Sequence, residues 1–148
     1  VHGEWDGDWD EAEGIRIVVG GDRKVRAVIK EDGEVVDGKG TTLAYIESNG
    51  EVGDPAMNYV GKAHSEAHQV IDHEDHVVGD FDAGRGYVKD AQGSVIAELF
   101  KDGAIKDNAG QSIGVIEGFE YTKMTTLAAY FLLVDREMLR AVVVGRRY

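Results

Sequence analysis

Short runs of alternating apolar and polar residues recur along the middle of the chain, between residues 30 and 118. Each run carries Val or Ile two residues before an Asp, an aliphatic residue six positions after it, Gly or Ala seven after it, and an apolar residue nine after it. The aspartates are Asp37, Asp54, Asp72, Asp90 and Asp107, spaced 17 or 18 residues apart. Alternation predicts half-buried β-strands, and a fixed period predicts one structural unit repeated along the chain.

Each repeat is predicted to be a β-hairpin with its turn at the Asp. In three repeats Gly follows the Asp by three residues, at Gly40, Gly93 and Gly110. This spacing suits a type I turn closed by a left-handed residue, while the Asp side chain caps nearby backbone N–H groups. We therefore interpret the five aspartates as structural turn residues and not as catalytic groups.

A further hairpin is predicted at residues 15–29, ahead of the five repeats. Its composition is similar and Gly20, Gly21, Asp22 and Arg23 would form its turn, but it fits the repeat frame poorly. Terminal repeats are often atypical because they cap an array. The segment is therefore interpreted as a sixth, degenerate hairpin.

The small residues of the repeats imply open space on one face of the strands. They are Ala44, Gly61, Gly79, Ala97 and Gly114. Strict alternation places them on the same face as the residues five and nine positions after each Asp. The segment 124–139 is predicted to be a helix that fills this space, because residues 127–134 are all apolar and rich in Leu and Ala. Thr125 or Thr126 is the expected N-cap.

The predicted fold is all-β with one C-terminal helix. Repeated hairpins close into a shallow barrel or flower around the apolar helix, within a single domain spanning 1–148. The remaining segments are an acidic head at 1–13 and a closing strand with a basic tail at 141–148.

Charge limits the partners that the chain is expected to bind. The chain has 148 residues with 16 Lys and Arg against 28 Asp and Glu, a net charge of −12. Such a charge opposes attraction to nucleic acid and makes binding to an anionic membrane surface unfavourable. The head carries six acids and residues 123–148 carry a net +3, so head and tail could attract each other within one molecule or in a homo-oligomer. The chain has no Cys, which excludes disulfide scaffolds and cysteine zinc fingers.

The frame G-x-V-x-D-x-x-G-x-x-I-G, its period and the apolar segment after it resemble the bacterial β-flower proteins. In that family hairpin petals form a shallow symmetric barrel, related in shape to the tubby C-terminal domain and to scramblases of similar form. The resemblance implies no established catalysis. Its tubby-like relatives imply lipid-headgroup binding through basic residues, for which this chain offers Arg136, Arg140, Arg146 and Arg147.

Four histidines are candidate ligands for a divalent metal. His64, His68, His73 and His76 lie within thirteen residues and alternate with carboxylates. Imidazole and carboxylate are ligands for zinc and similar metals. The alternative interpretation is a solvated polar turn without a cofactor, and in either case imidazole would make this hairpin sensitive to pH.

Two tryptophans, Trp5 and Trp9, flank the acids of the head. They are expected to pack an edge strand onto the barrel or to form an aromatic binding platform. Among catalytic and nucleotide-binding motifs, the sequence shows no nucleophile elbow, Walker loop, Rossmann fingerprint or HExxH. The head resembles no signal peptide, so a cytoplasmic location is the default expectation.

Three functions remain open from the sequence. The first is a non-catalytic binding or assembly module built on the hairpin barrel. The second is a metal-binding protein or small hydrolase that uses the cluster from His64 to His76. The third is tubby-like binding to lipid or to a membrane surface.

Overall fold

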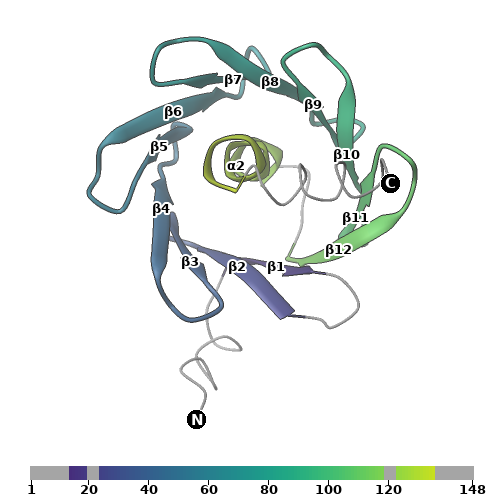
Figure 1. The fold of residues 1–148 in the computed structure, drawn as a ribbon, viewed down its shortest axis with the longest axis horizontal. Helices are drawn as coiled ribbons and strands as arrows, with labels where there is room; N and C mark the ends of the chain where they lie inside the picture. The colour runs from purple at the N-terminus through teal and green to yellow at the C-terminus, as the bar shows by residue number, and fades with distance from the viewer. Residues whose placement is uncertain (1–13, 20–23, 119–122, 136–148) are drawn as a thin grey trace, which may run out of the picture.

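Twelve antiparallel strands close into one barrel around a helix (Figure 1). The computed structural model describes residues 14–19, 24–118 and 123–135. Every strand pairs with its neighbours in the chain, and the first strand pairs with the last to close the ring. The predicted all-β barrel of repeated hairpins is thereby confirmed.

The strands form six hairpins in chain order. They are β1 (Gly14–Val19) with β2 (Lys24–Lys30), β3 (Glu34–Asp37) with β4 (Thr42–Ile46), β5 (Glu51–Gly53) with β6 (Tyr59–His64), β7 (Gln69–Asp72) with β8 (Val77–Asp82), β9 (Tyr87–Asp90) with β10 (Val95–Leu99), and β11 (Ala104–Asp107) with β12 (Ser112–Glu117). The hairpin tips, here called outer turns, point away from the centre, while inner turns connect one hairpin to the next (Figure 1).

The second strand of every hairpin contains a β-bulge. In β4, Thr42 pairs with Val36 and Ala44 pairs with Val35, so Leu43 is the extra residue. Val35 and Val36 are consecutive and point to opposite faces, so their partners Thr42 and Ala44 do too. The prediction that positions five and seven after the Asp share a face is therefore wrong. The bulge reverses the alternation, and the aliphatic residue at position six packs against the core instead.

The first hairpin departs from the frame by a single residue. In β3 and β4 the inward pair Val35 and Ala44 is nine positions apart, and the other four repeats keep that separation. In β1 and β2 the corresponding pair, Ile17 and Ala27, is ten positions apart. The degenerate hairpin is thus a full member of the ring, with one more residue between its inward-facing pair than the other hairpins have.

The helix runs through the middle of the ring (Figure 1). It comprises an α-helical segment, α2 (Met124–Ala129), and a π-helical segment, η2 (Tyr130–Val134). Leu127, Tyr130 and Phe131 are fully buried, as expected for a helix without a polar stripe. The predicted N-cap is wrong, because Lys123 caps α2 without a side-chain hydrogen bond and both threonines lie inside the helix. No helix in the described ranges is long and apolar enough to cross a membrane.

Two glycines provide the space that the helix occupies. A Cβ on Gly61 would lie 2.8 Å from Cδ2 of Leu133, and one on Gly79 would lie 2.7 Å from Cδ1 of Leu132. The small position of these hairpins therefore admits side chains of η2. The predicted helix end at 139, the closing strand at 141–148 and the acidic head at 1–13 lie outside the described residues.

Candidate functional site

The outer turns of the five regular hairpins share one hydrogen-bond pattern. In each, Oδ1 of the leading Asp accepts from the backbone N–H groups two and four residues later. The backbone N–H three residues later donates to the Asp carbonyl. These contacts organise the turns at Asp37, Asp54, Asp72, Asp90 and Asp107, which is the role interpreted from the sequence.

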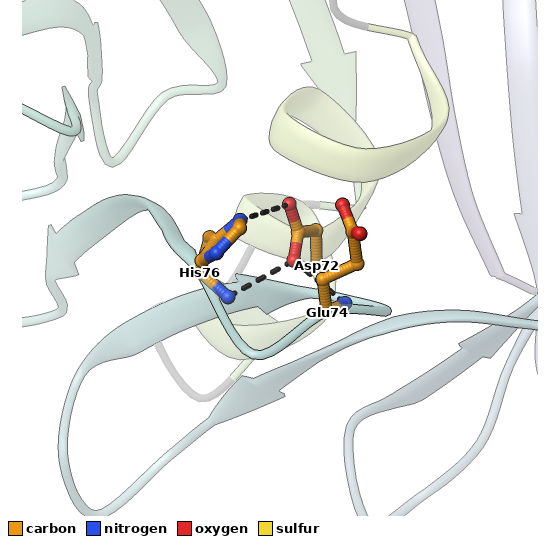
Figure 2. Close-up of side chains that lie close together, drawn as sticks. All are labelled: Asp72, Glu74 and His76. Atoms are coloured by element: carbon orange, nitrogen blue, oxygen red, sulfur yellow. Dashed lines mark hydrogen bonds and ion pairs between the residues drawn. The ribbon is translucent and has the colours of Figure 1, made fainter.

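The β7–β8 outer turn also brings metal-ligating groups together (Figure 2). One ligand atom from each of Asp72, Glu74 and His76 lies within 4.8 Å of the other two. Nδ1 of His76 is 3.8 Å from Oδ2 of Asp72. Two carboxylates and an imidazole are a donor set that zinc accepts. It is the one such group among the residues that the structure describes.

The structure separates the four histidines predicted to act together. His64 ends β6, and His68 lies in the inner turn that precedes β7. His73 and His76 lie in the outer turn at the other end of β7. The imidazole of His68 stacks on Phe81, with ring centroids 5.4 Å apart. Only His76 joins the cluster of Figure 2. The length of β7 separates His68 from this turn, and His73 lies in the turn but outside the cluster.

Several carboxylates lie close to this turn. The N–H of His76, which donates to Asp72, lowers the pKa of the Asp72 carboxyl, which is therefore ionised at neutral pH. Partial burial raises the pKa of the Tyr59 phenol, and the negative charges of Asp75, Glu51 and Asp72 raise it further. A cation near this turn would encounter a favourable potential.

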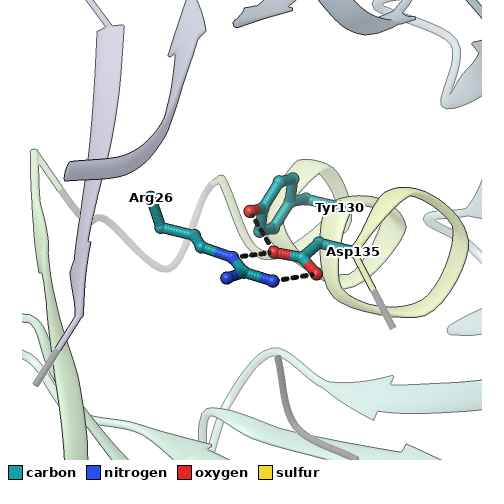
Figure 3. Close-up of polar contacts among 3 residues, drawn as sticks. All are labelled: Arg26, Tyr130 and Asp135. Atoms are coloured by element: carbon teal, nitrogen blue, oxygen red, sulfur yellow. Dashed lines mark hydrogen bonds and ion pairs between the residues drawn. The ribbon is translucent and has the colours of Figure 1, made fainter. Parts of the chain in front are cut away.

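A second polar group links the end of the helix to β2 (Figure 3). Nε of Arg26 donates to Oδ2 of Asp135 at 2.6 Å, and its Nη2 donates to Oδ1 at 2.9 Å. The hydroxyl of Tyr130 donates to Oδ2 of Asp135 at 2.9 Å. The hydrogen bonds to Asp135 raise the pKa of Arg26, and burial raises that of Tyr130, so neither group titrates near neutral pH.

Sequence reasoning missed this group, although a signal was available. Arg26 is the bulge residue of its hairpin, since Ile17 pairs with Ala27 and Val18 pairs with Val25. The residues at the same position in the other hairpins are Leu43, Val60, Val78, Ile96 and Ile113, all aliphatic. An Arg at a position where the other five hairpins carry aliphatic residues indicates a polar contact, which the structure shows to be with Asp135. Because Ile17 and Ala27 are ten positions apart and not nine, the repeat frame did not align Arg26 with these residues.

A cleft of about 350 Å³ lies on the inner-turn side of the barrel, beside the start of α2. Its charged and hydroxyl groups come from the end of β2 and the turn after it, from the turn after β4, and from the N-cap and first turn of α2: Lys30, Glu31, Asp32, Glu47, Ser48, Lys123 and Thr126. Ile15, Ile29 and Ile46 complete the lining together with two glycines. Both signs of charge and an apolar floor are thus present in one concavity of a size typical of small-molecule sites.

Three large apolar side chains are exposed among the described residues. Met57 is 64% exposed, Tyr59 46% and Val77 43%, all on the neighbouring β5–β6 and β7–β8 hairpins. Trp5 and Trp9, the other predicted binding residues, lie outside the described residues.

Comparison with protein-family models, with curated proteins and with solved structures finds no match to the chain.

Proposed function

We propose that this chain is a non-catalytic binding module whose ligand site is the cleft beside the start of α2. The observation that carries the proposal is the lining of the cleft, which combines two lysines, three acids and two hydroxyls above isoleucine side chains. A ring of paired strands provides a rigid frame for such groups, as binding sites require. The proposed relationship to the β-flower proteins agrees with this role, because that resemblance implies no established catalysis.

The charges of the lining favour a small zwitterion as the ligand. Lys123 offers a cation to an anionic group, and Glu47 offers a carboxylate to an ammonium group. The ammonium of Lys30 adds positive charge to the lining but is already paired with Glu34 at 3.4 Å. A simple anion would be repelled by the net charge of −12, whereas a molecule that carries both charges is not. The ligand class is therefore an amino acid or a similar compact zwitterion.

Thermal unfolding in the presence of amino acids and betaines tests the proposal, with simple carboxylates and simple amines as comparison compounds. A ligand that binds only the folded state raises the midpoint in a concentration-dependent way. Calorimetry should then show affinity reduced at least about tenfold by Lys123→Gln and by Glu47→Gln. Lys101→Gln is the matched control, because Lys101 is exposed in the inner turn before β11, away from the cleft.

Two results would overturn the proposal. One is that no zwitterion of the panel changes the unfolding midpoint. The other is that a zwitterion binds with an affinity that Lys123→Gln and Glu47→Gln leave unchanged.

A further inference from the structure

The five regular outer turns provide an internal comparison for the group at Asp72. In each turn the leading Asp draws together the residues two and four positions later, because one carboxylate oxygen accepts both of their N–H groups. The pairs held in this way are Lys39 and Thr41, Ala56 and Asn58, Glu74 and His76, Gln92 and Ser94, and Ala109 and Gln111. Only the β7–β8 turn places a carboxylate and an imidazole at those positions.

We propose that Asp72, Glu74 and His76 form a binding site for a divalent transition metal, with Zn²⁺ as the best match. The site is separate from the cleft and from the function proposed for it. Asp72 and Glu74 would contribute carboxylate oxygen and His76 imidazole nitrogen, with water completing the coordination. A mixed set of oxygen and imidazole ligands favours zinc and nickel over calcium and magnesium, which take oxygen ligands alone.

The distances permit this coordination after a small movement. Ligands about 2.1 Å from a tetrahedral zinc ion lie about 3.4 Å from each other. The three ligand atoms already lie within 4.8 Å of one another. The His76 side chain is 74% exposed and Glu74 is exposed, so both can rotate inward by the remaining distance. Asp72 needs no movement because the turn already holds its carboxylate in place.

The charge around the turn also favours a cation. The two carboxylate ligands are close in the chain to Asp75. The negative charges of Asp72, Asp75 and Glu51 also raise the pKa of the nearby Tyr59 phenol. A divalent ion would neutralise both carboxylate ligands and relieve their mutual repulsion. None of the other four turns has an acid at the second position after its Asp.

Zinc binding to the whole chain, prepared without a histidine tag, tests the proposal by competition with a chromophoric chelator. We expect one saturable site per chain, weakened at least about tenfold by Glu74→Gln and by His76→Asn. Asp72 is left unchanged because it holds the turn. His73→Asn and His64→Asn are matched controls, since they remove imidazoles of the same segment that lie outside the group.

Introducing the same ligands into another hairpin gives a second, independent test of the proposed metal site. The β9–β10 turn has the same hydrogen bonds around Asp90. The double variant Gln92→Glu and Ser94→His should therefore bind two zinc ions per chain. Absence of saturable zinc binding by the unaltered chain would overturn the proposal. So would binding that depends on His73 and not on His76, or a transferred turn that adds no site.

Discussion

Backbone conformation at single residues distinguishes the hairpins from each other. The residue three positions after the turn Asp has a positive φ in all five regular hairpins. Gly takes that position in three of them, but Met57 has φ 69° and Asp75 has φ 65°. A side chain in this left-handed region costs about 1–2 kcal/mol relative to Gly, and somewhat less for Asp. The shape of the turn is thus imposed by the Asp and by strand pairing even where the local residue opposes it.

Met57→Gly is expected to stabilise the chain by about 1 kcal/mol, because it removes this strain and Met57 buries little surface. Denaturant unfolding measures the change. Gly110→Ala is the converse control, since its φ is 83° and a Cβ there would meet nothing within 4 Å. It should destabilise the chain by about 1 kcal/mol through conformation alone. Equal stability of both variants and the unaltered chain would contradict this account.

At the scale of elements, the helix must adopt one rotation inside a ring of six similar hairpins. The helix could be turned about its axis to face any of the six hairpins. Apolar packing favours one such orientation only weakly, because most hairpins present aliphatic side chains to the centre. Two features break the symmetry: the space at Gly61 and Gly79 receives Leu133 and Leu132, and Arg26 binds Asp135. A hydrogen-bonded ion pair is directional and therefore selects one orientation.

Arg26→Leu is expected to destabilise the chain by about 1–3 kcal/mol, because Asp135, whose side chain is 11% exposed, loses its guanidinium partner. Arg26 is 42% exposed, so solvent screening keeps the loss below that of a fully buried pair. Adding Asp135→Leu should recover part of this loss, because no unpaired carboxylate then remains beside position 26, where the other hairpins carry an aliphatic residue. The recovery is incomplete because the buried Tyr130 hydroxyl loses its acceptor. Denaturant unfolding of the two single variants and the double variant gives a double-mutant cycle for the Arg26–Asp135 interaction. Strictly additive losses of stability would show that the two residues do not interact energetically.

At the scale of the whole molecule, the barrel and the helix depend on each other. Eight strands enclose a lumen that side chains alone can fill, and the diameter grows with strand number. Twelve strands therefore leave a space that this fold fills with Leu127, Tyr130 and Phe131. Nearly all strand pairs are neighbours in the chain. Within the described part of the chain, the pairing of β1 with β12 and the docking of the helix are the contacts that join distant segments.

A chain ending at Gly118, without the helix, is expected to lose cooperative unfolding. Its strands would retain far-UV circular dichroism, but the empty lumen would bind a hydrophobic dye and the near-UV signal would be lost. Phe131→Leu in the full chain is the matched control and should unfold cooperatively at a lower midpoint. Cooperative unfolding of the shortened chain, without dye binding, would show that the barrel is stable alone.

The sequence by itself determined the hairpins, their number and the burial of the helix, because each depends on local patterns. Asp37 and its counterparts specify a turn within five residues, and the apolar segment at 127–134 has no face suited to water. Much of the fold was therefore predictable. The bulges were not, since the extra residue at Leu43 is defined by pairing with another strand.

Only the tertiary structure decided which side chains meet. Arg26 and Asp135 are 109 residues apart, and His68 and His76 are close in the chain but lie at opposite ends of β7. Proximity of side chains follows from strand register and ring closure, which depend on contacts between distant segments. Closeness in the sequence suggested a group of four histidines. The strand and turn geometry instead brings one of them, His76, to Asp72 and Glu74.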